Sequence, residues 1–272
     1  NLGIANKFNI NLKNLNSIGK NYSEYKSSPQ TEFVSIFSFN SSLPLQKNNQ
    51  KYQSFLTPKA SFRFNPSDMK NYSSSSKTIN YGNIFDINRL GLSDTHEAGR
   101  SLTLGIDYKT EKDNKKDLES INKYFEFKLA TVLRDKEENF FPKTSTLNRK
   151  NSNLFGTIDN NLYENFRIKY DFALDNDLNK LEYNNLMTTL DFGNFQTTFN
   201  FIDENGEMGN SSILENSFIY SFDALNSLKF NTRRNRKLNL TEYYDLVYEY
   251  KNDCLTAGIK YKKTYYEDRD LK

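Results

Sequence analysis

The stretch that decides the fold is Leu162-Tyr163-Glu164-Asn165-Phe166-Arg167-Ile168-Lys169-Tyr170-Asp171-Phe172-Ala173-Leu174, where large apolar residues take nearly every second position and Glu164 interrupts them. The residues between them are mostly polar or charged. Because successive side chains of a β-strand point to opposite faces, the stretch predicts a strand with one apolar and one polar face. Repeated segments of this kind are typical of transmembrane β-barrels, whose apolar face meets lipid and whose polar face lines the lumen.

The same alternation recurs along most of the 272-residue chain, between turns rich in Asn, Asp, Gly and Ser. It predicts an all-β fold, an antiparallel up-and-down meander of about 12–13 strands that is part of a large transmembrane β-barrel. The predicted strands are 4–14, 31–46, 52–64, 99–110, 120–134, 152–158, 161–174, 179–192, 194–203, 212–222, 226–236, 241–251 and 254–265. No segment keeps a 3.6-residue spacing, so helices are not expected to organise the fold.

The predicted connections differ in length between the two edges of the sheet. Short ones fall near 47–51, 192–194, 222–226 and 251–254, and longer ones at 15–30, 65–98, 135–151, 203–211 and 236–240. The segment 111–119 is a long exception on the short-turn edge. Outer-membrane barrels combine short periplasmic turns with long external loops, whereas a soluble β-sandwich, which also alternates, has no reason to sort its loops.

The composition agrees with a membrane-embedded sheet. Hydrophobic residues make up 36% of the chain and aromatic residues 15%, with 22 Phe and 18 Tyr, so much of the apolar area lies in single rings between polar residues. No stretch reaches the roughly 18 apolar residues that a spanning helix needs. The net charge of +3 is spread along the chain, which excludes a nucleic-acid partner, and the basic cluster at 233–237 is expected to be a solvated loop.

Few residues could carry chemistry. His96 is the sole histidine and stands near Asp94 and Glu97, so a metal or acid–base role can be considered. One imidazole with two loop carboxylates falls short of a zinc site or a catalytic triad, and a solvated loop histidine is the favoured interpretation. We therefore predict no catalytic residue, metal or cofactor, and no enzyme activity.

Cys254 is the sole cysteine and follows the turn residues Lys251, Asn252 and Asp253 on the short-turn edge. A cysteine exposed to the oxidising periplasm is a candidate for a disulfide, and its partner would then lie outside this sequence. The alternative is an inert small residue, since free cysteines are often buried.

Three segments resemble the LPS-assembly protein family LptD, also called OstA. Residues 250–259 resemble a barrel strand that starts just after a turn with an acidic residue and a cysteine. Residues 83–105 resemble the family's Phe-x-x-x-Arg segment (Phe85 to Arg89), which is followed by Glu-x-Gly (Glu97 to Gly99) and a new strand. Residues 58–66 are similar to the strand and loop before it, although this chain has one cysteine where some members have an adjacent pair.

The resemblance implies that residues 1–272 are a partial barrel domain, with the N-terminal periplasmic domain, the early strands and the last strand outside it. It implies lipopolysaccharide transport from a periplasmic bridge through the barrel into the outer leaflet of a Gram-negative outer membrane. The partners would be lipopolysaccharide, outer-membrane lipid, an LptE-like plug lipoprotein and an LptA-like bridge. Cys254 would correspond to the cysteine that ties the barrel to the periplasmic domain. A generic porin or nutrient receptor is the alternative, and an outer-membrane phospholipase is disfavoured by the lone histidine.

Overall fold

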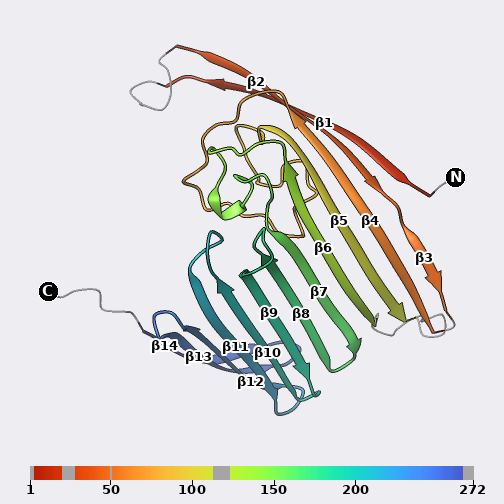
Figure 1. Cartoon of the computed structure of the whole chain (residues 1–272). Coiled ribbons are helices and arrows are strands. Elements are labelled where there is room, and N and C mark those ends of the chain that lie inside the picture. The colour runs from red at the N-terminus through yellow and green to blue at the C-terminus, as the bar shows by residue number, and fades with distance from the viewer. Residues whose placement is uncertain (1–2, 20–27, 50, 113–122, 266–272) are drawn as a thin grey trace.

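The computed structural model describes residues 3–19, 28–49, 51–112 and 123–265, which form one antiparallel sheet of 14 strands (Figure 1). The strands are β1 (Ala5–Ser17), β2 (Gln30–Ser42), β3 (Leu45–Asn48), β4 (Tyr52–Asn65), β5 (Gly99–Lys112), β6 (Tyr124–Arg134), β7 (Leu154–Tyr163), β8 (Phe166–Leu174), β9 (Leu181–Asp191), β10 (Phe195–Glu204), β11 (Ser211–Ser221), β12 (Asn226–Asn235), β13 (Leu240–Lys251) and β14 (Thr256–Thr264). Neighbours in sequence are neighbours in the sheet, except that β3 pairs with β4 beside β2. The predicted all-β meander is confirmed.

The sheet curves around two loops that lie on its inner side (Figure 1). Among the described residues β1 pairs only with β2 and β14 only with β13, so the two outermost strands do not meet and the sheet is not closed. The helical content of these residues is one 3₁₀ turn, η1 (Lys143–Ser145). None of their helices is long and apolar enough to cross a membrane.

The stretch 161–174, predicted as one strand, is a tight hairpin, so this prediction was wrong. β7 continues to Tyr163 and β8 begins at Phe166, and these two residues pair across the turn formed by Glu164 and Asn165. The single break in the alternation at Glu164 therefore marks a change of direction. In a hairpin with a two-residue loop, the apolar pattern resumes on the returning strand without a long polar linker.

The predicted strand 31–46 is also divided, and this accounts for the additional strand. Pairing of β2 with β4 stops at Ser42, and β3 resumes pairing with β4 at Leu45. Pro44 lies in the interruption and has no N–H to donate to a ladder, while the Leu43 N–H donates to the Pro58 carbonyl at 3.1 Å. A proline inside an alternating run therefore interrupted the strand.

The two edges of the sheet carry connections of different length, as predicted, except that 236–239, which was expected to be long, has four residues like the turns 222–225 and 252–255. Segments 66–98, 135–153, 175–180, 205–210 and 236–239 lie on one edge, and the turns 164–165, 192–194, 222–225 and 252–255 lie on the other. Most of the exceptional connection 111–119 lies outside the described residues. Because strand direction alternates, successive connections fall on alternate edges of the sheet, and, apart from that exception, the longer ones share one edge.

The largest apolar core lies between the sheet and its loops. We call residues 66–98 the inner loop and residues 135–153 the second loop. Both pack on the inner face of β6, β7 and β8 (Figure 1). The buried cluster comprises Met69, Ile79, Ile84, Leu90, Leu92, Ala98, Ala130, Val132, Phe141, Leu147, Phe155, Ala173 and Met208. The inner face is thus not polar throughout, contrary to the sequence-based expectation.

Candidate functional site

The two faces of the sheet differ sharply in character. On β5, Leu102, Leu104 and Ile106 are 36–41% exposed on the outer face, whereas Ser101 and Thr103 on the inner face are at most 3% exposed. The same outward exposure recurs from one end of the sheet to the other, at Phe8, Ile10, Leu12, Phe39, Leu56, Phe62, Phe199, Leu246, Tyr248, Ile259 and Tyr261. Alternation along each strand therefore produces one continuous apolar surface.

Aromatic rings form a row on this outer face across the later strands. The ring centroids of Phe195 and Phe218 are 6.0 Å apart, those of Phe218 and Phe230 5.3 Å, and those of Phe230 and Tyr244 6.0 Å. Each ring comes from the next strand along the sheet, β10 to β13. Rings at these separations gain some attraction beyond their buried area.

A buried ion pair within the inner loop orients Arg89 towards the sheet. The Arg89 guanidinium donates to both oxygens of the Glu97 carboxylate, with Nε at 2.9 and 3.0 Å and Nη2 at 2.7 Å. Arg89 also donates to Thr103 and Ser101 of β5. The two charged side chains are 0% and 4% exposed. These are the Arg and Glu of the Phe-x-x-x-Arg and Glu-x-Gly segments, to which sequence analysis assigned no role.

Two further contacts hold the inner loop in place. Arg63 of β4 donates to the carbonyls of Ile84 at 3.0 Å and Asp86 at 2.7 Å. The Phe85 ring lies so close to Gly105 of β5 that an added Cβ would be 2.6 Å from the ring. The absence of a side chain at Gly105 therefore allows the phenyl ring to approach the strand backbone.

His96 is buried, not solvated, so the sequence-based prediction for it was wrong. Its side chain is 1% exposed, and neither ring nitrogen has a hydrogen-bond partner among the described residues. Burial, assisted by the nearby Lys13 ammonium, lowers the pKa of His96 to about 4, so the imidazole is neutral at pH 7. Lys13 of β1 donates to the Leu92 and Thr95 carbonyls at 2.6 and 2.9 Å, which pins the segment that carries His96.

Glu97 remains ionised although it is buried. Burial alone would raise its pKa, but the charge and hydrogen bonds of Arg89, together with the charges of Arg63 and Arg134, hold the pKa below the ordinary glutamate value. The neighbouring Asp94 instead accepts a hydrogen bond from Tyr72 and lies 3.3 Å from the Lys70 ammonium. The three residues singled out in the sequence thus have separate environments, and the described residues contain no group of His, Cys, Asp and Glu suited to a metal.

The basic cluster at 233–237 is only partly a loop. Arg233 and Arg234 belong to β12, and the Arg233 guanidinium lies 3.0 Å from Glu215 and 2.7 Å from Glu242 on the adjacent strands. The expectation of a solvated loop holds for Arg236 and Lys237 and fails for the first two residues, because the strand extends to Asn235. Arg233 therefore balances carboxylates of the two adjacent strands.

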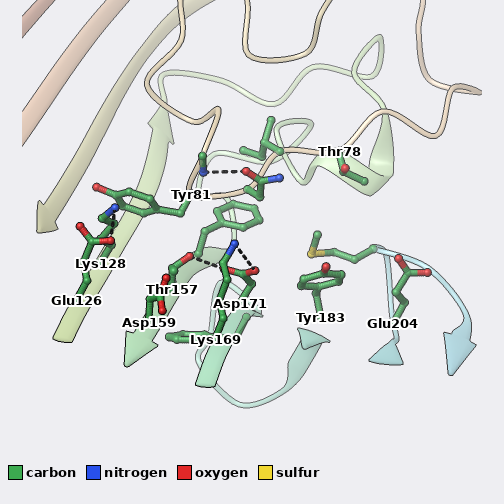
Figure 2. A pocket seen from close by; sticks show the side chains of 17 residues that line it. Thr78, Tyr81, Glu126, Lys128, Thr157, Asp159, Lys169, Asp171, Tyr183 and Glu204 are labelled. Carbon is green, nitrogen blue, oxygen red and sulfur yellow. Dashed lines mark hydrogen bonds and ion pairs between the residues drawn. The ribbon is translucent and has the colours of Figure 1, made fainter. Parts of the chain in front are cut away.

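A cavity of about 430 Å³ lies beneath the inner loop, between its residues 78–82 and the inner face of β6 to β10 (Figure 2). Tyr81 lies beside Lys128 and Glu126 of β6, and the Lys128 ammonium is 5.7 Å from the centre of the Tyr81 ring. Asp171 of β8 and Tyr183 of β9 form the opposite wall. This mixed polar and aromatic cavity was not predicted, because its parts come from segments far apart in the sequence.

Cys254 lies where it was predicted, in the turn between β13 and β14 at the short-turn edge. Its thiol is exposed and free within the described part of the chain. The Asn252 side-chain oxygen accepts hydrogen bonds from the N–H groups of Cys254 at 3.0 Å and Leu255 at 2.7 Å. The Asn side chain thereby fixes the turn and keeps Cys254 outside the sheet.

A family model described as LPS transport system D (LptD) matches residues 9–233, which is most of the chain and includes the inner loop with Arg89 and Glu97. No curated protein matches the chain.

Proposed function

The chain belongs to the LptD family of LPS transport proteins, and on that premise we propose that it forms part of an outer-membrane β-barrel that delivers lipopolysaccharide to the outer leaflet. The observation that carries the proposal is the continuous apolar outer face. Leu12 is 72% exposed, Phe33 74% and Ile259 75%, on strands at opposite ends of the sheet. A soluble protein rarely exposes so wide an apolar surface, whereas hydrocarbon solvates it.

We propose further that residues 1–272 act as one domain and that other strands of the same protein complete the barrel. The backbone groups at the free edges of β1 and β14 need partners within a bilayer, because hydrocarbon offers none. Closure by additional strands supplies them.

A generic porin or nutrient receptor remains the alternative function. Two features favour lipopolysaccharide transport over it: the family match and the packing of the inner and second loops on the sheet. A porin keeps a wide aqueous channel, whereas here an apolar core with Phe141 and Leu147 fully buried fills the space beside β6 and β7. We assign no catalytic role to His96, since its imidazole is buried within the inner loop.

Depletion of the full-length protein in its own bacterium tests this function. Lipopolysaccharide reaching the cell surface should fall on depletion and recover when the full-length gene is restored. The readout is lipopolysaccharide accessible to an antibody added to intact cells. Unchanged surface lipopolysaccharide together with slower uptake of small solutes would favour the porin and contradict the proposal.

Cys254 is proposed to form a disulfide with a cysteine of the periplasmic domain. The exposed thiol at the short-turn edge supports this, because barrels of this type direct short turns to the periplasm. On a non-reducing gel the full-length protein should migrate faster than its Cys254→Ser variant, and reduction should remove the difference. Equal mobility before reduction would exclude the disulfide. We also propose two protein partners, an LptE-like plug in the lumen and an LptA-like bridge on the periplasmic domain.

A further inference from the structure

The cavity beneath the inner loop has the size of a small-ligand site. Its volume of about 430 Å³ lies towards the lower end of the roughly 300–1,000 Å³ typical of small-molecule pockets. The loop above it is held by the Arg89–Glu97 pair, by Arg63 and by the hydrogen bond from Thr144 to the Lys77 carbonyl at 2.8 Å. Because these contacts exist before any ligand enters, binding would require little reorganisation of the loop.

The walls combine flat apolar surfaces with hydrogen-bonding groups. Tyr81, Phe155 and Tyr183 supply the rings, and Asn80, Thr157 and the carboxylates supply polar atoms (Figure 2). A sugar ring has the matching chemistry, since its C–H faces pack on aromatic rings and its hydroxyl groups both donate and accept hydrogen bonds. The carboxylates make the stronger, charge-assisted bonds to such hydroxyl groups.

The charged side chains that line the cavity favour unphosphorylated over phosphorylated sugars. Four carboxylates line it, Glu126, Asp159, Asp171 and Glu204, against the ammonium groups of Lys128 and Lys169. Both ammonium groups already face carboxylates, Lys128 with Glu126 at 2.8 Å and Lys169 with Asp171 at 3.5 Å. Asp159 is likewise paired, with Arg167 at 2.7 Å, which leaves Glu204 as the lining carboxylate without an ion pair among the described residues. A phosphate group would therefore meet this unbalanced carboxylate, and each lining ammonium group is already paired.

We propose that this cavity binds an unphosphorylated sugar unit of the lipopolysaccharide chain. This site rests on the lipopolysaccharide transport function proposed above. The phosphorylated part of lipopolysaccharide would lie outside this cavity. Asp171 is the central hydrogen-bond acceptor, since it already takes the Thr157 hydroxyl at 2.7 Å and faces the cavity. Tyr183 supplies the ring against which the sugar packs. The inner loop holds Tyr81 over the opposite side, where its hydroxyl donates to Asp107.

Ligand-observed NMR on the detergent-solubilised full-length protein tests the site, with glucose and glucose 6-phosphate as probes. We expect glucose to bind and glucose 6-phosphate to bind more weakly. Asp171→Ala should weaken glucose binding about tenfold or more, the scale of one lost charge-assisted hydrogen bond. Tyr183→Ala should weaken it by a similar factor, because the sugar loses the ring on which it packs. Asp171→Asn keeps the shape of the side chain and removes its charge. Weaker glucose binding in this variant would therefore not be explained by a folding defect.

Matched controls come from the uncovered part of the inner face. Asp245 on β13 lies 3.1 Å from Lys260, as Asp171 lies near Lys169, and Tyr243 on β13 lies near Lys262. Asp245→Ala and Tyr243→Ala should leave glucose binding unchanged. Equal glucose binding in all variants, no glucose binding by the wild type, or tighter binding of glucose 6-phosphate would each overturn the sugar site. If any of these results occurs while surface lipopolysaccharide in the wild type is normal, the sugar site is wrong and the proposed transport function is not contradicted.

Discussion

Glu97→Gln is the change that most directly probes how the inner loop is held on the sheet. The substitution keeps the size of the side chain and removes its charge. Arg89, Arg63 and Arg134, which are 2–7% exposed, then lose the carboxylate that balances them. Because a buried guanidinium without a counter-charge is costly, we expect the loop to leave the sheet more often while the strands stay paired.

The size of the effect follows from the burial of the pair. Removing one partner of a buried, hydrogen-bonded ion pair costs about 3–5 kcal/mol, and roughly 1.4 kcal/mol corresponds to a factor of ten in an equilibrium constant. The population of the detached loop should therefore rise by roughly two to three and a half orders of magnitude. The matched control is Glu242→Gln. Glu242 lies 2.7 Å from Arg233, which is also the separation of the Arg89–Glu97 pair. The Arg233 side chain is 39% exposed and the Glu242 side chain 31%. An exposed pair of this kind is worth at most about 1 kcal/mol.

Limited proteolysis of the full-length protein in detergent measures the detached population, with mass spectrometry locating the cuts. Cleavage within residues 66–98 should rise steeply in Glu97→Gln and stay near the wild-type rate in Glu242→Gln, when opening is fast relative to cleavage. The upward shift of the heat-denatured band on a gel reports whether the barrel itself has unfolded. If Glu97→Gln is cleaved no faster than Glu242→Gln while both barrels remain folded, the buried pair does not hold the loop.

Three further predictions concern pH, close packing and the membrane-facing surface. His96 has a folded pKa lowered from 6.5 to about 4, so the detached state takes up a proton first as the pH falls. Cleavage of the inner loop should therefore rise up to tenfold per pH unit between these values, and His96→Met should flatten that dependence. Gly105→Ala should also release the loop, because the new Cβ would lie 2.6 Å from the Phe85 ring and 2.9 Å from the Leu129 carbonyl oxygen, and the side-chain ring is the part that can move away; unchanged cleavage would contradict this contact. Leu104→Lys on the outer face should cost about 2–4 kcal/mol in urea unfolding from lipid vesicles, whereas the inner-face Thr198→Lys should be nearly neutral.

The sheet could be predicted from the sequence because its signal is local. An alternating run such as 241–251 specifies a strand and its two faces from neighbouring residues alone. The errors lie where one residue outweighs the pattern. Pro44 removes a donor and divides one predicted strand, and Glu164 marks a reversal inside another. Each residue stands inside an alternating segment that continues on both sides of it, so the periodicity alone predicts one uninterrupted strand.

The loops could not be predicted in this way, because their contacts are non-local. Arg63 reaches the inner loop from β4, and the Glu97 partner of Arg89 becomes buried only after the loop folds onto the sheet. One local clue existed. In Leu129-Ala130-Thr131-Val132-Leu133 the apolar residues occupy both faces, which indicates a strand covered on its lumen side as well. The full burial of Val132 and of Phe155 on the adjacent strand bears out that clue.

Contacts of the inner loop explain why the residues of the family's motifs occur where they do. Phe85 packs on Gly105, Arg89 pairs with Glu97, and Gly99 adopts a left-handed backbone (φ 76°) where the loop enters β5. Gly99 tolerates this conformation without a steric penalty, whereas most residues would be strained there. These residues therefore specify how the inner loop packs on the inner face of the sheet, so replacing them should release the loop before it disrupts the strands.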